Sequence, residues 1–159
     1  MKYIKGDLIK AALRCEYDVI AQGCNCMNTM GKGLALQMKT VFPEAYHVDK
    51  LTDKADINKL GRISSVRITL HNHQGRMHRL TIVNCYIQLR YSNFEEVVNY
   101  DAIESCFNIM KHEFSGKRIA IPKIGAGLAG GDWDRIETII NNIMVDEDIT
   151  VIEYENKRI

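Results

Sequence analysis

Two glycine-bearing segments, far apart in the chain, carry the clearest chemical signal in this sequence. The first runs from Gly23 to Leu34 and contains Gly31-Lys32-Gly33, and the second runs from Ile124 to Gly131 and contains four glycines. Each follows a short apolar stretch that predicts a β-strand. A glycine-rich turn between a strand and a helix directs backbone N–H groups at an anion, and the helix N-terminus adds partial positive charge. One such loop predicts a phosphate site, and two on a small chain predict a diphosphate held between them.

Three polar residues lie beside predicted strand ends or helix starts, where they could take part in the chemistry of a site. Asp7 can accept a hydrogen bond from the exocyclic amine of adenine, or it can cap the helix that follows it. Asn25 can hold two ribose hydroxyls or tie its own turn to the neighbouring backbone. Asp132 can serve as an acid or base, but we favour a capping role for the helix that begins at Trp133. The sequence leaves both roles open for Asp7 and Asn25.

Other chemistries receive less support from the sequence. Neither glycine segment has the Lys-Ser/Thr ending of a P-loop or the three spaced glycines of a dinucleotide fingerprint. Cys24 and Cys26 could form half of a metal site, but no second ligand pair with zinc-type spacing follows, so we predict neither a metal nor a cofactor. The five cysteines are odd in number and lie mostly among apolar residues, which favours reduced thiols.

Length and composition predict one globular domain spanning residues 1–159. The chain has 159 residues, of which 46% are hydrophobic, enough to build a core. A formal net charge of +1 counts against a general polyanion-binding protein. The chain has neither an apolar run of about 20 residues, the length that spans a bilayer, nor an N-terminal signal peptide. We therefore expect a cytoplasmic protein that does not engage a membrane.

The elements that must position these residues alternate between strands and helices. Residues 62–70 and 77–88 flank a polar stretch and predict a hairpin in the middle of the chain. This order favours an α/β protein, a three-layer α/β/α domain with a mixed sheet, in which ligands bind outside the carboxyl ends of the strands. Both glycine segments lie at such ends. The other predicted strands are 2–5, 18–23, 118–122 and 149–154, and the predicted helices are 8–13, 32–42, 44–51, 99–114 and one starting at Trp133.

The order of the motifs resembles that of a macrodomain, a family that binds ADP-ribose. The resemblance rests on Gly6-Asp7-Leu8, on Gly23-Cys24-Asn25-Cys26 with Gly31-Lys32-Gly33, and on the segment from Ile121 to Leu128. Together these motifs cover almost the whole chain. Within the family, the sequence is similar to the branch that holds ADP-ribose 1″-phosphate phosphatases and the terminal ADP-ribose protein glycohydrolase. The Gly-Cys-Asn-Cys segment and the Gly-Leu-x-Gly-Gly-Asp-Trp segment point to the phosphatase side.

The resemblance implies a role for each matching residue. Asp7 and Leu8 would select adenine, with Tyr154 nearby, and Asn25 would hold the distal ribose. The two glycine segments would enclose the diphosphate, and the strand from Asn84 to Gln88 would form part of the pocket wall. The ligand-binding residues implied in this way are Asp7, Leu8, Asn25, Gly31, Lys32, Gly33, Leu34, Ile124, Gly125, Ala126, Gly127, Leu128, Ala129, Gly130 and Tyr154.

One departure from the family pattern bears on the reaction. The glycohydrolase branch relies on a lysine after the middle hairpin and an aspartate after the second Gly-x-Gly-Leu, and this chain has Leu89 and Ala129 at those positions. The neighbouring Arg90 stays protonated and cannot replace an amine nucleophile. The expected reaction is therefore hydrolysis of ADP-ribose 1″-phosphate to ADP-ribose and phosphate. The catalytic candidates are Asn25, Asn28, Gln88 and Asp132, which would position the substrate and water.

Three other functions remain open. The protein could hydrolyse ADP-ribosyl bonds on modified macromolecules, or bind ADP-ribose without turning it over. The hairpin could also bind nucleic acid, because Arg62, Arg67, Arg76 and Arg79 lie close to His71, His73 and His78. We interpret that hairpin as a solvated surface and do not expect nucleic acid as a partner. The expected partners are ADP-ribose, its 1″-phosphate and ADP-ribosylated macromolecules.

Overall fold

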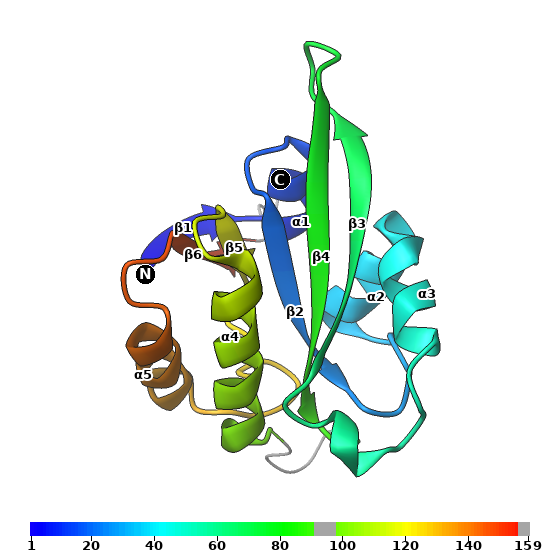
Figure 1. Ribbon diagram of the computed structural model, residues 1–159, viewed down its shortest axis with the longest axis vertical. Coiled ribbons are helices and arrows are strands. Elements are labelled where there is room, and N and C mark those ends of the chain that lie inside the picture. Colours follow the sequence, from blue (N-terminus) through cyan, green and yellow to red (C-terminus); the bar gives the residue numbers. More distant parts are fainter. Residues whose placement is uncertain (91–97, 156–159) are drawn as a thin grey trace.

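A six-stranded mixed sheet forms the middle of the protein (Figure 1). The computed structural model describes residues 1–90 and 98–155. Each neighbouring pair of strands is parallel except β3 and β4, which form the predicted hairpin. In spatial order the strands are β1 (Lys2–Gly6), β6 (Ile149–Tyr154), β5 (Ile119–Ile121), β2 (Val19–Asn25), β4 (Met77–Gln88) and β3 (Ile63–His71).

Helices cover both faces of this sheet, so the predicted three-layer architecture is confirmed (Figure 1). On one face, α4 (Tyr100–Phe114) and α5 (Trp133–Ile143) pack on the strands through one apolar cluster. On the other face, a second cluster joins the strands to α1 (Leu8–Leu13), α2 (Gly33–Val41) and α3 (Pro43–Lys50). Alternate residues of the central strand β2 enter the two clusters, since successive side chains of a strand point to opposite faces.

Local sequence explains where several helices begin. The side chain of Asp7 accepts a hydrogen bond from the amide of Lys10 at 3.0 Å, and Asn99 caps α4 in the same manner. The third helix starts at Pro43, one residue before the predicted start, because proline is well tolerated in the first turn of a helix. The short 3-10 helix Ile57–Lys59 was not predicted, since three residues are too few to produce a periodic pattern.

The parallel strands place their carboxyl ends along one edge of the sheet, and both glycine segments leave from that edge. The β3–β4 turn lies at the opposite end of β4, which begins at Met77 and finishes at Gln88 (Figure 1). Within the parts of the chain that the structure describes, no helix has the length and apolar character needed to cross a membrane.

Candidate functional site

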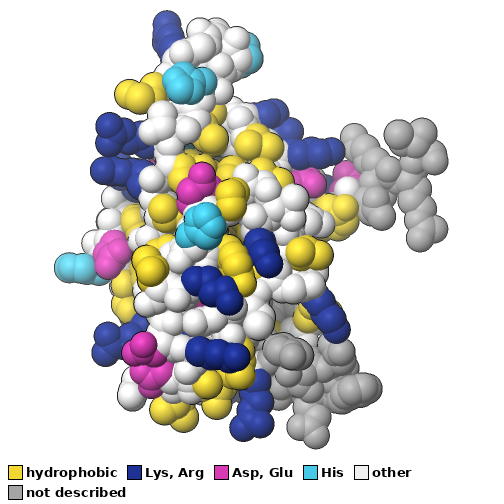
Figure 2. All heavy atoms as spheres, turned by 90° about the vertical axis from the view of Figure 1, so that its right-hand side faces the viewer, with side chains coloured by type: hydrophobic (Ala, Val, Ile, Leu, Met, Phe, Trp, Pro, Cys, Tyr) yellow, Lys and Arg dark blue, Asp and Glu magenta, His cyan; other side chains and the backbone are white. Residues whose placement is uncertain are grey.

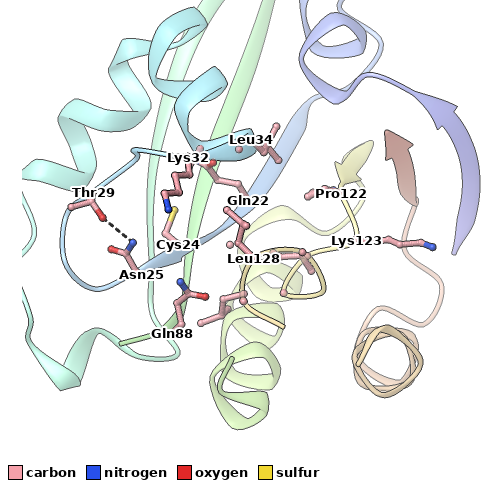
Figure 3. Close-up of a pocket in the computed structure, with 18 of the residues that line it drawn as sticks. Gln22, Cys24, Asn25, Thr29, Lys32, Leu34, Gln88, Pro122, Lys123 and Leu128 are labelled. Carbon is pink, nitrogen blue, oxygen red and sulfur yellow. Dashed lines mark hydrogen bonds between the residues drawn. The ribbon is translucent and has the colours of Figure 1, made fainter. Parts of the chain in front are cut away.

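A cavity of about 590 Å³ opens at the carboxyl edge of the sheet, between the two glycine segments (Figure 3). Its floor comes from the ends of β2 and β4, one wall from the start of α2, and the other wall from the loop after β5. The lining residues are Gln22, Gly23, Cys24, Asn25, Thr29, Gly31, Lys32, Gly33, Leu34, Ala35, Ile87, Gln88, Pro122, Lys123, Ile124, Gly125, Gly127, Leu128 and Ala129.

The first wall is the N-terminus of α2, which no side chain of the described residues caps. Lys32 occupies the capping position and makes no capping hydrogen bond, and the first turn contains no acidic residue. The amides of Gly33, Leu34 and Ala35 therefore have neither an intrahelical partner nor a side-chain cap, and all three residues line the cavity. Free amides at a helix N-terminus, next to the lysine ammonium, form a surface suited to an anion.

The second wall is the loop that follows β5, and its shape depends on two glycines. Gly125 has φ +78°, which favours glycine, and a Cβ on Gly131 would lie 2.6 Å from the carbonyl oxygen of Gly125. Among the described residues, no hydrogen-bond acceptor meets the amides of Gly125, Gly127, Leu128 or Ala129. These four residues line the cavity, so this wall also offers unpaired N–H donors.

The two walls approach each other at Gly33 and Leu128. A Cβ built on Gly33 would lie 3.6 Å from Cδ1 of Leu128, whose side chain is otherwise well exposed. Gly33 also has φ +56°, so glycine is favoured there for its backbone as well. The cavity is therefore bounded on two opposite sides by backbone that can come close to a ligand.

A chain of hydrogen bonds fixes the polar groups beneath the floor. Gln22 donates to Asn84 at 2.9 Å, and Asn84 donates to the hydroxyl of Ser64 at 3.1 Å. Ser64 and Tyr86 share a 2.8 Å bond, and the Tyr86 hydroxyl donates to the buried carboxylate of Asp49 at 2.7 Å. The amide of Asn84 also donates to a backbone carbonyl, which fixes its orientation. Gln22 must then donate through Nε2, and its Oε1 is the one buried side-chain oxygen without a partner among the described residues.

Two of the predicted catalytic residues lie side by side in the cavity. Asn25 and Gln88 are register partners at the ends of β2 and β4, and both line the cavity. The Asn25 amide also holds its own turn, since Oδ1 accepts from the amide of Met27 and Nδ2 donates to Thr29, each at 2.9 Å (Figure 3). The structural and the binding role that the sequence left open for Asn25 are therefore compatible.

The other two catalytic candidates do not line the cavity. Asn28 is 7% exposed, and its Oδ1 accepts a 2.5 Å hydrogen bond from the buried ammonium of Lys59. Its amide nitrogen donates to the carbonyl oxygen of Thr52, so the side chain ties the first glycine segment to the following loop. Asp132 caps α5 by accepting from the amide of Asp134 at 3.0 Å, which is the capping role that the sequence favoured.

The residues expected near adenine lie beyond the cavity, along the same edge of the sheet. Gly6 and Tyr154 are register partners on β1 and β6, so Asp7 and Tyr154 are neighbours at the ends of these strands. Asp7 also caps α1, and Leu8 is buried in the core beneath it. Ten of the predicted ligand-binding residues line the cavity: Asn25, Gly31, Lys32, Gly33, Leu34, Ile124, Gly125, Gly127, Leu128 and Ala129. The five that do not are Asp7, Leu8, Ala126, Gly130 and Tyr154.

Sequence reasoning missed several residues of the cavity. Gln22 was overlooked, although a polar residue inside an apolar strand was a usable signal. Thr29 and Lys123 gave no comparable signal, because polar residues are common after strands. Lys123 pairs with Glu153 at 3.2 Å, whereas no ion pair among the described residues involves Lys32. Within residues 1–90 and 98–155, Lys32 is therefore the cavity cation that pairs with no carboxylate.

The thiol of Cys24, which lines the cavity, is unreactive. Burial raises the pKa of Cys24 well above its ordinary value, so this cavity-lining thiol stays protonated and is a poor nucleophile. All five cysteines have free thiols. Across residues 1–90 and 98–155, no group of three His, Cys, Asp or Glu side chains is placed to hold a metal ion. The donors of the lining residues are backbone amides, the side-chain amides of Gln22, Asn25 and Gln88, the hydroxyl of Thr29, and the ammonium groups of Lys32 and Lys123.

Comparison with known proteins gives relatives over the whole chain, although no family model matches it. The sequence is 36% identical to the 17.5 kDa protein of the tk-vs intergenic region of Enterobacteria phage T4, over 98% of this chain and 97% of that protein. It is 26% identical to the ADP-ribose 1″-phosphate phosphatase of Scheffersomyces stipitis, over 96% of this chain and 99% of that protein. It is also 26% identical to the DNA ADP-ribosyl glycohydrolase of Mycobacterium tuberculosis, but it covers only 36% of that longer protein.

Solved structures show the same fold at lower identity. The macrodomain of Thermus aquaticus DarG superimposes with a TM-score of 0.65 and 22% identity, over 98% of this chain and 97% of that chain. Thermosipho africanus DarTG, solved in complex with ADP-ribose, gives a TM-score of 0.75 and 18% identity, over 99% of this chain and 42% of that chain. The shared architecture extends across both walls of the cavity.

Proposed function

The chain belongs to the same family as the phage T4 17.5 kDa protein and has the macrodomain fold, and from this premise we propose that it binds ADP-ribose. One observation carries the proposal. Among the described residues, Gly33–Ala35, whose amides are uncapped, and the residues of the second loop whose amides have no partner line a single cavity from opposite sides. A diphosphate between them receives hydrogen bonds on both flanks, and Lys32 adds a positive charge.

The rest of the nucleotide fits along the carboxyl edge. The cavity volume of about 590 Å³ is typical of small-ligand sites. Three strand spacings separate β2 from β1, or about 14 Å at roughly 4.8 Å each, which lets the nucleotide extend from the cavity toward Asp7. The Asp7 carboxylate uses one oxygen to cap α1 and keeps the capacity to accept a further hydrogen bond from adenine. The distal ribose then lies over Asn25 and Gln88.

The reaction that we propose is hydrolysis of ADP-ribose 1″-phosphate. The similarity to the phosphatase of Scheffersomyces stipitis supports it, because that similarity covers almost the full length of both proteins. The lysine expected of the glycohydrolase branch is replaced by Leu89, whose side chain packs in an apolar cluster with Tyr86 and Cys26. The site therefore favours water as the nucleophile over a covalent amine route.

In this reaction, water attacks the phosphorus of the 1″-phosphate, and the bond from phosphorus to the oxygen on C1″ breaks. That oxygen takes a proton and leaves as the C1″ hydroxyl of ADP-ribose, and the second product is inorganic phosphate. The side-chain amides of Asn25 and Gln88 orient the distal ribose and the water. The backbone amides of the two walls hold the diphosphate, so most of the rate enhancement comes from positioning.

A second candidate is hydrolysis of ADP-ribose from a modified macromolecule. It is favoured by the similarity to a DNA ADP-ribosyl glycohydrolase at the same 26% identity. The third candidate, binding without turnover, uses the same cavity and amides. All three candidate functions use ADP-ribose or its derivatives as the ligand. They differ in the bond that is hydrolysed: the bond to the 1″-phosphate, the bond to a macromolecule, or none.

The test is phosphate release from ADP-ribose 1″-phosphate, followed by phosphorus NMR with EDTA present so that a contaminating metal cannot produce turnover. We expect inorganic phosphate to accumulate while the diphosphate signals of the product persist. Gln88→Ala and Asn25→Ala should each lower kcat by about 10²-fold, within the range expected when a positioned group is lost. Asn58→Ala, an exposed amide outside the cavity, serves as the matched control and should retain full activity.

Each result has a distinct meaning. Perturbed diphosphate signals without phosphate release would overturn the phosphatase assignment. The protein would then either bind ADP-ribose without turnover or hydrolyse a different ADP-ribose bond. Release of ADP-ribose from ADP-ribosylated DNA would assign the second candidate. Absence of any ligand-induced shift would reject ADP-ribose as the ligand.

A further inference from the structure

Charge is unevenly distributed along this chain. The whole sequence has 21 basic and 20 acidic residues, yet residues 57–90 contain six Lys or Arg, three His and no Asp or Glu. This segment includes the whole β3–β4 hairpin. Its far end projects beyond the helices (Figure 1), and Figure 2 shows Lys, Arg and His side chains at that end with no Asp or Glu among them. The near-neutral total charge therefore conceals a basic surface.

The strand register places Arg67 and Arg79 on one face of the hairpin. Arg67 lies opposite Thr81 and Thr69 lies opposite Arg79, so the two arginines are diagonal neighbours, about 7–8 Å apart. His71 continues the same face toward the turn, which carries Arg76. All of these except Thr81 are exposed. We call the surface formed by Arg67, Thr69, His71 and Arg79, together with Arg76 in the adjoining turn, the ribbon face.

The opposite face of the hairpin anchors it to the body of the protein. Ile68, Leu70 and Leu80 belong to the apolar cluster that also holds α1. His78 points to this side and bonds the carbonyl oxygen of Tyr17 at 2.7 Å. The nearby carboxylate of Asp18 forms its ion pair with Arg118 at 3.0 Å. The ribbon face is thus held rigidly, and the ion pairs of the described residues leave its arginines without a carboxylate.

We propose that the ribbon face binds the phosphate backbone of nucleic acid. A two-stranded ribbon has the dimensions that the major groove of a duplex admits. Arginine forks suit phosphate oxygens, and the threonine and histidine between them supply further donors. The sole large apolar side chain exposed on this part of the hairpin is Met77, so the surface lacks the apolar centre of a protein interface. This site goes beyond the proposed function and does not depend on it.

The ribbon face and the cavity lie at opposite ends of β4. Arg79 and Gln88 are nine residues apart on this strand, a separation of about 30 Å at roughly 3.3 Å per residue. A nucleic acid on the ribbon face therefore leaves the cavity free. ADP-ribose and nucleic acid should bind at the same time.

The experiment is fluorescence anisotropy with a labelled 20-base-pair DNA duplex, measured from 50 to 200 mM salt. Three arginine contacts predict a slope of about −2.7 in a plot of log K against log salt, and thus a roughly 40-fold loss over that range. The variant with Arg67, Arg76 and Arg79 all changed to alanine should lose at least 10-fold in affinity at 50 mM salt. The control variant changes exposed Lys5, Lys50 and Lys54 to alanine, which removes the same charge outside the hairpin, and should keep the wild-type slope.

Two further arms make the outcome decisive. Saturating ADP-ribose should leave DNA affinity unchanged, and the triple arginine variant should keep its affinity for ADP-ribose, which also verifies that it is folded. Equal loss of DNA binding in both triple variants would overturn the proposal in favour of a diffuse charge effect. Competition by polyglutamate as strong as that by DNA would overturn it in favour of an acidic protein partner. Failure of the wild-type protein to bind ADP-ribose would reject the proposed function but would leave the nucleic-acid proposal unaffected.

Discussion

The side chain of Gln22 donates a 2.9 Å hydrogen bond to Asn84, its register partner on the neighbouring strand. This bond begins a chain that continues through Ser64 and Tyr86 and ends at the carboxylate of Asp49. Gln22 lines the cavity, whereas Asp49 lies in the interior on α3. This series of hydrogen bonds therefore connects the floor of the site to the buried carboxylate of Asp49. It also fixes the orientation of the side-chain amides of Gln22 and Asn84.

Loss of the Tyr86 hydroxyl should destabilise the protein. Tyr86→Phe keeps the ring but removes the donor to Asp49, a residue that is 1% exposed. Burial already raises the pKa of Asp49, and a buried acceptor that loses its donor costs about 1–3 kcal/mol of unfolding free energy. Chemical denaturation measures the change. Tyr46→Phe is the control, and a similar loss there would show that the hydrogen-bond chain is not the cause.

Two glycines of the second loop should respond differently to alanine. Gly131→Ala forces a Cβ to within 2.6 Å of a backbone oxygen, so it should lower the unfolding free energy by about 1–3 kcal/mol. A Cβ on Gly127 meets nothing within 4 Å, so Gly127→Ala should keep its stability. Because Gly127 lines the cavity, the added methyl should weaken ADP-ribose binding by about tenfold, or about 1.4 kcal/mol. Denaturation and calorimetric titration of the two variants separate the effects, and equal stability losses would contradict this assignment.

Removal of the Lys32 ammonium should weaken ligand binding without unfolding the protein. Lys32 is exposed at the start of α2 and lines the cavity, so Lys32→Ala loses a charge next to the diphosphate. We expect an affinity loss of about tenfold, comparable to one charge-assisted hydrogen bond. Thermal shift measures it, since a ligand at 100 times its Kd stabilises the native state by about 2.7 kcal/mol. Lys54→Ala is the control, and an unchanged shift in Lys32→Ala would exclude a role in binding.

Acid should remove the contribution of the Asp18–Arg118 pair. The hydrogen bond from Arg118 lowers the pKa of Asp18 in the folded protein, so the carboxylate holds its proton less tightly than in the unfolded chain. The resulting stability is present above the unfolded pKa of about 4 and is lost as the pH falls through the lower folded pKa. A double-mutant cycle with Asp18→Asn and Arg118→Gln should give a coupling of about 0.2–1 kcal/mol at pH 7. Persistence of the same coupling at a pH below the folded pKa of Asp18, as located by NMR titration, would show that this ion pair is not its source.

The sequence by itself determined the order of the elements and the two glycine segments. Period-two and helical patterns specify strands and helices locally, and glycine marks positions where backbone comes near a ligand or adopts positive φ, as at Gly125. These signals depend only on neighbouring residues. They were sufficient to predict the mixed sheet and the two glycine segments that flank the cavity. Most of the individual lining residues were implied by the resemblance of the ordered motifs to a macrodomain.

Only the tertiary structure decided which polar side chains reach the cavity. Asn28 and Asn25 share one turn, yet Asn28 is drawn inward by Lys59, which is 31 residues away, while Asn25 faces the site beside Gln88. The orientation of Gln22 in the cavity floor is set by its hydrogen bond to Asn84, which lies 62 residues away in the sequence. The sequence showed that the hairpin is basic, but only the strand register showed that Arg67 and Arg79 lie on one face. The physical reason is that side-chain direction and partnership depend on contacts between distant segments, which local patterns do not record.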